Sequence, residues 1–311
     1  MSGRVHSRPG RITCQGEGDA MDWLNHLAGL ISDNKIPIGK WAEVVVGWIT
    51  DNLSWFFDAL SSGLGFLVDN TVWLLSLVPA LLLIPAICAI AYWLHRNWMM
   101  VAGVVAGLLL ILNLGFWDQM IETLVLVLYA TLFSLLIGIP LGIYAARRPW
   151  FYRGLQPVLD MMQTLPTFVY LIPTLILFGL GSVPGLISTV IFAVPQPIRL
   201  THLGITSVPK PLIEAGEAFG ATRQQLLWKV EVPHAMPTIM AGVNQTIMMS
   251  LSMVVIATLV GAGGLGVPVI RALSSVNIAQ GFEAGLAIVI VAILLDRIMK
   301  RPAPGTKPKG G

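Results

Sequence analysis

The chain has 311 residues, of which 55% are hydrophobic and 11% are charged, and its formal net charge is +3. Soluble domains carry about 25% charged residues, so this chain has too few charges to cover a surface that faces water. The composition, with a mean hydropathy of +0.77, excludes an ordinary soluble enzyme and predicts that lipid surrounds much of the chain.

Residues 1–36 are expected to form a disordered polar tail. Met1 to Ala20 are rich in Arg and Gly and lack the apolar core of about 7–15 residues that a secretory signal needs. Translation starting at Met21 is an equally open interpretation, because the sequence MDWL is a natural opening.

Residues 37–71 are expected to form an amphipathic helix at the membrane interface. Trp41, Trp48 and Trp55 recur with aliphatic residues at helical spacing, and Asp51 and Asp58 interrupt the run. Tryptophan favours the depth of the lipid headgroups. A helix packed on the outer face of the bundle is the alternative.

Seven apolar runs predict an all-α integral membrane protein with about seven transmembrane helices, two of them in the segment 72–117. A run of about 18–25 uncharged residues is long enough to cross a bilayer as a helix. A membrane barrel would instead show alternating stretches of about ten residues. The expected spans are Val72–Leu94, Met99–Phe116, Thr123–Ala146, Met161–Leu180, Val183–Ile198, Thr238–Val260 and Gly285–Leu295, the last extended at both ends.

Lys and Arg gather in alternate connections, which predicts that those connections face the cytoplasm. The opposite side holds Asp118, Glu122, Glu283 and the lone Arg271. The N-terminus is therefore expected outside, and the C-terminal tail 300–311 inside. The cytoplasmic cations are Arg96, Arg147, Arg148, Arg153, Arg199, Lys210, Arg223, Lys229, Arg297, Lys300, Arg301, Lys307 and Lys309.

The connection 200–236 is the longest, and its sequence predicts a pair of short helices. Pro211 suits the first turn of a helix that continues to Phe219. Gly220 is placed to end that helix as a left-handed cap.

A second short helix is expected to follow at once. Thr222 with Gln225 three residues later has the pattern of a capping box. This helix is expected to continue through Lys229 and to stop at Pro233. The connection is therefore predicted to be a rigid helix–turn–helix.

The order of residues in this connection resembles the EAA loop of binding-protein-dependent ABC importer permeases, whose pattern is E-A-A-x3-G-x9-I-x-L-P. The spacing is kept throughout, while Gly216, Val230 and Val232 replace Ala, Ile and Leu. In that family the loop is the coupling helix, which docks into a groove on the ATPase subunit. The resemblance implies this role for Glu214, Ala215, Gly216, Gly220, Ala221, Thr222 and Pro233.

From about Gln119 onward the chain is similar to the permeases of glycine betaine/proline betaine importers. The stretches LDMMQTLPTFVYLIPTLILFGLG and MPTIMAGVNQTIMMSLSMVVIATLVGAGGLG carry this resemblance. It implies a type I ABC importer permease fold over residues 118–299, in the cell inner membrane, importing a quaternary ammonium osmoprotectant. Choline permeases are closely similar, so choline, carnitine or another small solute is the alternative cargo. The family places the aromatic cage for a methylated cation on the binding protein.

The resemblance implies partners: two copies of an ATP-binding subunit, a periplasmic solute-binding protein and a second permease copy. The chain contains no G-x-x-x-x-G-K-[ST] sequence, so ATP is expected to bind to the partner subunit. We therefore expect no catalytic residue, no cofactor and no enzymatic activity in this chain. Cys14 and Cys88 and the five histidines lack the spacing of a metal site, so no metal is expected, and neither is a nucleic-acid partner.

Two patterns resemble chemical sites without their context. Gly261, Gly263 and Gly266 match G-x-G-x-x-G, but a dinucleotide site needs a preceding strand, and an apolar helix is expected here. We interpret the glycines as a flexible turn at the end of the sixth span. His202 and His234 have no nucleophile or acidic partner placed with them, which favours interfacial histidines over a catalytic pair.

Polar residues in the sixth span leave two interpretations open, a lining of the transport pathway or hydrogen bonds between helices. Gln245 and Ser252 share one face with Met249 and Ile256 by helical spacing. An ion-gradient-driven transporter, the alternative of a different class, predicts charged residues within the spans, and the seven expected spans contain none. The candidates are Asn244, Gln245, Ser250 and Ser252.

Overall fold

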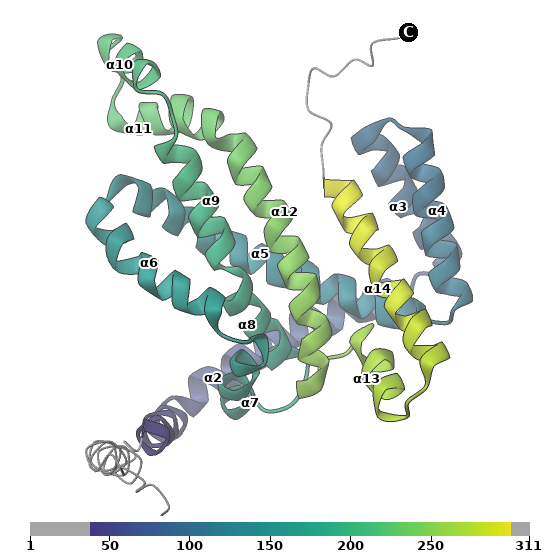
Figure 1. Cartoon of the computed structure of the whole chain (residues 1–311). Coiled ribbons are helices and arrows are strands. Elements are labelled where there is room, and N and C mark those ends of the chain that lie inside the picture. Colours follow the sequence, from purple (N-terminus) through teal and green to yellow (C-terminus); the bar gives the residue numbers. More distant parts are fainter. Residues whose placement is uncertain (1–37, 300–311) are drawn as a thin grey trace, which may run out of the picture. The chain divides into compact units, whose positions relative to one another are not determined.

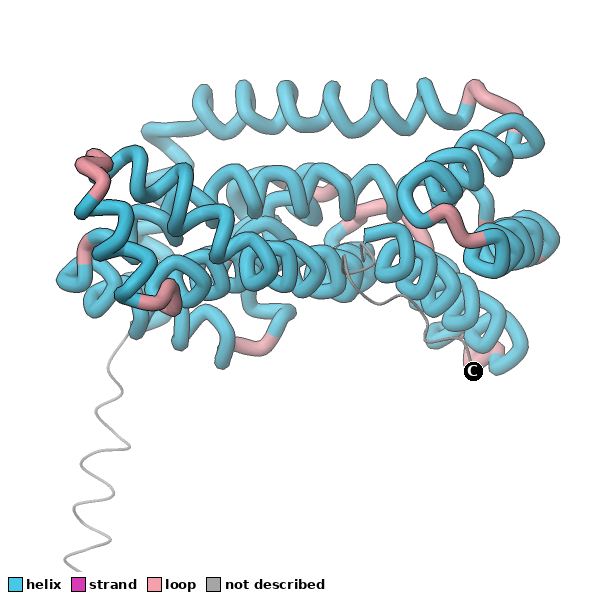
Figure 2. The backbone as a smooth tube through the Cα atoms, turned by 90° about the horizontal axis from the view of Figure 1, so that it is seen from above, coloured by secondary structure: helices cyan, strands magenta, loops and turns pink. Residues whose placement is uncertain are grey.

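The computed structural model describes residues 38–299, and every regular element in that range is a helix (Figures 1 and 2). The expected tails and the alternative start at Met21 lie outside these residues. The chain divides into two compact units, 1–52 and 53–311, and the packing below is that of the second. The helices are α2 (Ile38–Ser76), α3 (Ala80–His95), α4 (Trp98–Asn113), α5 (Trp117–Arg147), α6 (Pro149–Thr164), α7 (Leu171–Phe178), α8 (Ser182–Ala193), α9 (Pro195–Thr206), α10 (Lys210–Ala218), α11 (Arg223–Leu226), α12 (Val232–Ala257), α13 (Gly266–Ser274) and α14 (Ile278–Met299), with the 3-10 helices η1 (Thr167–Tyr170) and η3 (Thr258–Val260) and the π-helix η2 (Leu227–Glu231).

A sharp bend divides the first expected span, Val72–Leu94. α2 ends at Ser76, α3 begins at Ala80, and the two helices meet at 105°. Pro79 at the bend is extended, with φ −54° and ψ 139°, and it has no N–H to continue a helical ladder. This segment is therefore not one straight helix, and the expected boundary after residue 71 falls inside α2.

The fourth expected span, Met161–Leu180, is divided in the same way. α6 ends at Thr164, and the helical segment Thr167–Phe178 leaves it at 110°. Pro166 is extended, with φ −56° and ψ 139°. Each break therefore coincides with a proline in the extended conformation.

Four helical runs among residues 38–299 are long and apolar enough to cross a membrane. The number rises to six if each bent pair forms one span, and α4 is a shorter apolar helix of 16 residues. The expected count of seven is therefore not confirmed. The four runs are Trp117–Arg147, Ser182–Thr206, Arg223–Val260 and Ile278–Ile298.

Helix α9 packs against both α5 and α12, and glycines allow the close approach. A Cβ built on Gly142 of α5 would lie 2.7 Å from the backbone oxygen of Ile198. A Cβ built on Gly204 of α9 would lie 3.2 Å from the backbone oxygen of Ala235. Membrane helices use small residues in this way because lipid tails are as apolar as the side chains, so helices associate through close van der Waals packing and not through the hydrophobic effect. This packing places the ends of α5, α9 and α12 next to the segment 207–231.

Candidate functional site

The segment expected to form the coupling helix is α10. It follows Pro209, which is extended, and it carries Pro211 in its first turn, where the missing N–H has no helical partner to lose. None of its residues is buried, and Glu214 and Ala215 are exposed. The helix therefore presents its side chains outward.

The turn after α10 has the left-handed cap that the sequence predicts. Gly220 has φ +76°, its N–H donates to the Glu217 carbonyl at 2.8 Å, and the Ala221 N–H donates to the Gly216 carbonyl at 3.1 Å. These two bonds satisfy carbonyls that the end of the helix would leave free. A Cβ built on Gly220 meets no atom within 4 Å, so glycine is required here for its conformation and not for space.

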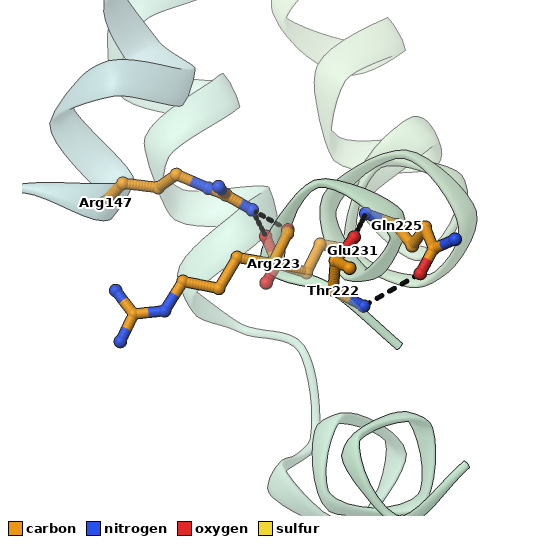
Figure 3. Close-up of polar contacts among 5 residues, drawn as sticks. All are labelled: Arg147, Thr222, Arg223, Gln225 and Glu231. Carbon is orange, nitrogen blue, oxygen red and sulfur yellow. Dashed lines mark hydrogen bonds and ion pairs between the residues drawn. The ribbon is translucent and has the colours of Figure 1, made fainter. Parts of the chain in front are cut away.

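The capping box that starts α11 is also confirmed. The Gln225 N–H donates to the Thr222 hydroxyl at 3.3 Å, and the Gln225 side chain accepts from the Thr222 N–H at 2.8 Å (Figure 3). Both donors would otherwise lack partners at a helix start. The turn between α10 and α11 is therefore fixed by backbone geometry on one side and by side-chain bonds on the other.

Gly216, which stands where the family pattern has alanine, lies against the second helix. A Cβ built on it would lie 2.5 Å from Cδ2 of Leu226, a side chain that is 4% exposed. The absence of a side chain at 216 therefore allows the two short helices to close on each other.

The expectation that Pro233 ends the second helix is wrong. α11 continues through the π-helix η2 into α12 as one helical run, Arg223–Val260. The Val232 N–H bonds to the Leu227 carbonyl five residues back. Pro233 lies in the first turn of α12, after this wider turn, where its missing N–H and its ring conflict least with the ladder.

Arg147, the last residue of α5, connects that helix to this segment. Its Nη2 donates to the Arg223 carbonyl at 2.7 Å and lies 3.6 Å from Oε2 of Glu231 (Figure 3). A small apolar cluster of Ile205, Leu227, Ala235 and Ile239 joins α9, η2 and α12 nearby. A cavity of about 420 Å³ separates α10 from the ends of α5 and α9.

Two residues of the site were not singled out as candidates from the sequence. Phe219, directly before the turn, is a large apolar side chain that is 92% exposed. An aromatic residue next to Gly220 in a polar loop could have signalled it. Arg147 is 76 residues away from its partner Arg223 in sequence, and no local pattern points to that contact.

The polar residues of α12 face two directions. Ser250 is buried and Asn244 is half-buried, whereas Gln245 and Ser252 are exposed on the face expected from helical spacing. The Ser252 hydroxyl donates to the Met248 carbonyl of its own helix at 3.0 Å. The exposed pair is therefore available to line a pathway, and the two interpretations, pathway lining and hydrogen bonds between helices, stay open.

The glycine-rich turn at 261–266 is held by the start of α5. The Gly264 N–H donates to Oε2 of Glu122 at 2.6 Å, and the Leu265 N–H donates to the Thr123 hydroxyl at 2.8 Å. Gly264 has φ +100°, and a Cβ on Gly263 would lie 2.3 Å from Oε2 of Glu122. The expected turn is present, but these contacts fix it in place, which differs from the expectation of a flexible turn. A helix, not a strand, precedes it.

The two histidines beside the segment have different surroundings. His202 stacks on Tyr152 of α6, with ring centroids 3.5 Å apart and planes at 8°. His234 is exposed in the first turn of α12. The interpretation as interfacial histidines stays a prediction.

The sequence profile described as "Binding-protein-dependent transport system inner membrane component" matches residues 138–306. Similar proteins include the glycine betaine transport system permease protein OpuAB of Bacillus subtilis, 46% identical over 89% of this chain and 98% of that protein. The glycine betaine/carnitine transport permease protein GbuB of Listeria monocytogenes is 47% identical over 85% and 94%. The glycine betaine/proline betaine permease ProW of Escherichia coli is 41% identical over 96% and 87%.

Among solved structures, a chain of the inward-facing MetNI methionine ABC transporter aligns with a TM-score of 0.52 and 25% identity, over 57% of this chain and 91% of that one. This alignment agrees with the all-helical architecture of residues 38–299. Because the profile covers more than half of the chain and the relatives match it over most of its length, the chain belongs to the family of inner membrane components of binding-protein-dependent transport systems and has the fold of an ABC importer permease.

Proposed function

We propose that this chain is the membrane-spanning permease subunit of an ATP-driven importer for glycine betaine or proline betaine. The observation that carries the proposal is the turn between α10 and α11, an outward-facing helix with an exposed Phe219 beside a left-handed glycine. The printed names of the most similar relatives supply the class of cargo. Carnitine is the second candidate, because a relative at 47% identity is a glycine betaine/carnitine permease.

The α10–α11 turn would dock on a separate ATP-binding subunit. An exposed apolar side chain is stabilised when a partner covers it, by about 25 cal/mol for each Å² removed from water. Phe219 and the half-exposed Leu212 offer such area at the tip of the segment. ATP hydrolysis would then belong to that partner, in two copies, and purified permease alone should hydrolyse no ATP above background.

The other partners would lie on the opposite side of the membrane and beside α12. A periplasmic solute-binding protein would deliver the cargo, and a second permease copy would complete the pathway. The N-terminus would lie outside and the C-terminus in the cytoplasm. Reporter fusions at Arg153 and Ser274 should report cytoplasm and periplasm, and the same signal at both positions would refute this orientation.

The test is uptake of radiolabelled glycine betaine into proteoliposomes that contain the permease with its ATPase, with ATP inside and the binding protein outside. We expect uptake that requires both ATP and the binding protein and that excess unlabelled proline betaine suppresses. The same competition with excess carnitine or choline tests the alternative cargoes, because a solute that the importer carries should also suppress uptake of the labelled betaine. Uptake driven by a sodium or proton gradient without ATP would refute the proposal in favour of a secondary transporter.

A further inference from the structure

Arg147 occupies a joint between the core of the bundle and the α10–α11 segment. It ends α5, in which Met120, Ile121 and Val125 near the opposite end and Ala145 beside Arg147 are at most 1% exposed. From this end its guanidinium reaches the first residue of α11 and the last residue of η2.

The contact joins a charged group to two different kinds of acceptor. The Arg223 carbonyl already accepts the Leu227 N–H within the helix, and its second lone pair takes the Arg147 Nη2–H at 2.7 Å. The same Nη2 lies 3.6 Å from the Glu231 carboxylate, and the two charged side chains are 32% and 15% exposed. A partly buried, charge-assisted contact of this kind holds its partners in a defined orientation.

α10 lies against α11 through the close approach of Gly216 to Leu226, and it stands apart from the ends of α5 and α9. The helix has no buried residue, and the cavity of about 420 Å³ lies between it and the ends of α5 and α9. Arg147, Arg223 and Glu231 all line that cavity. The cavity therefore separates α10 from α5, and Arg147 reaches α11 and η2 at the cavity edge.

We propose that Arg147 is a positioning residue that transmits movement of the α10–α11 turn to α5. The turn is connected to α12 by the continuous helical run, and to α5 through Arg147, so one docking event acts on two membrane spans. This inference rests on the proposed coupling function of the turn. It assigns to α5 a share of the coupling that the family pattern, confined to residues 214–233, does not contain.

Variants at Arg147 and Glu231 separate the hydrogen-bonding geometry of the contact from the charge of its side chains. Arg147→Gln removes the ion pair and keeps one donor, Arg147→Lys keeps the charge without the planar fork, and Glu231→Gln removes the other partner. Arg148→Gln is the matched control, because it removes the same charge one residue later, from a side chain that has no hydrogen bond or ion pair within residues 38–299.

The first measurement is the number of substrate molecules imported per ATP hydrolysed in proteoliposomes. In Arg147→Gln we expect hydrolysis within twofold of wild type and uptake lowered about tenfold, with Arg147→Lys between the two and Arg148→Gln unchanged. The double variant with Glu231→Gln should be no worse than Arg147→Gln, because contacting groups act as one unit. An unchanged ratio, or an equal loss in the control, overturns the inference. A permease that assembles only with arginine at 147 also overturns it, because that result shows a structural role.

The second measurement does not depend on the cargo. Hydrogen exchange of residues 140–147 in the complex should change when a non-hydrolysable ATP analogue binds, and this change should disappear in Arg147→Gln while α12 still responds. The same response of α5 with and without Arg147 would overturn the inference. If wild-type complexes fail to import betaine, the proposed function fails, and the exchange of α5 still decides the role of Arg147.

Discussion

Substitutions at Gly220 separate the backbone shape of the turn from its surface. The residue has φ +76°, and a Cβ built there meets no atom within 4 Å. Gly220→Ala therefore introduces only backbone strain of about 1 kcal/mol. This strain lowers the population of the native turn conformation, relative to other conformations, about fivefold. Asparagine and aspartate tolerate the left-handed region better than alanine, and they differ from each other mainly in charge.

We expect Gly220→Asn and Gly220→Ala to retain at least about a fifth of wild-type uptake, in line with that strain. Gly220→Asp should abolish uptake while the protein still inserts in the membrane. The added charge would lie beside Phe219, which is 92% exposed, and burying an unpaired carboxylate at a docked surface costs several kcal/mol.

The assay is betaine uptake measured alongside membrane abundance and co-purification of the ATPase. Normal uptake by Gly220→Asp would remove the coupling role assigned to the turn. An asparagine variant as inactive as the aspartate variant would show that charge is not the cause. A Gly220→Asp protein missing from the membrane would place the effect in folding.

Three further substitutions test the packing around the segment. Gly142→Ala would place a Cβ 2.7 Å from a backbone oxygen of α9. The clash costs about 1–3 kcal/mol and should lower the thermal midpoint of the purified protein. Gly154→Ala is the control, because a Cβ there meets no atom within 4 Å, and equal shifts of the midpoint in both variants would contradict this reasoning. Gly216→Ala should destabilise the segment, and adding Leu226→Val should restore the thermal midpoint, because valine lacks the Cδ2 that the new Cβ would meet at 2.5 Å; no recovery would show that the contact is not the cause. Thr222→Ala should cost about 1 kcal/mol and speed hydrogen exchange at residues 223–226, an effect that Thr222→Ser should not reproduce.

The details of the α10–α11 turn could be predicted from sequence because they depend on residues close together in the chain. A left-handed cap needs one glycine, and a capping box needs two residues three positions apart. Gly220 and the pair Thr222 and Gln225 have the expected geometry. Here local chemistry decides the structure without help from tertiary packing.

The breaks in the expected spans could not be predicted from hydropathy. A window average measures how apolar a segment is and does not register the backbone effect of one residue. Proline alone is also no guide, because Pro85 and Pro140 lie inside α3 and α5 whereas Pro79 and Pro166 lie at breaks. Neighbouring helices in a bundle can satisfy the backbone groups that an interior proline frees, and that depends on the fold.

The contacts that connect the site to the bundle also depend on the fold. Arg147 and Arg223 are 76 residues apart, and Glu122 and Gly264 are 142 residues apart. The continuation of the helix past Pro233 was also missed, since a π turn is a rare local geometry, here next to the buried Leu227 and Ala235. No short-range pattern distinguishes these positions from other charged residues or prolines in the chain.

The unbroken helical run from Arg223 to Val260 has a mechanical consequence. Its 38 residues span about 57 Å at a rise of about 1.5 Å each. The run packs closely on α9 where Gly204 meets Ala235, 12 residues from the start of the run and 25 residues from its end. A tilt of about 5° about that contact would move the far end by about 3 Å and the near end by about half as much, at a rise of about 1.5 Å per residue. If the run tilts as one unit, a displacement of the α11 end would be about doubled at the far end, next to the glycine turn that Glu122 holds.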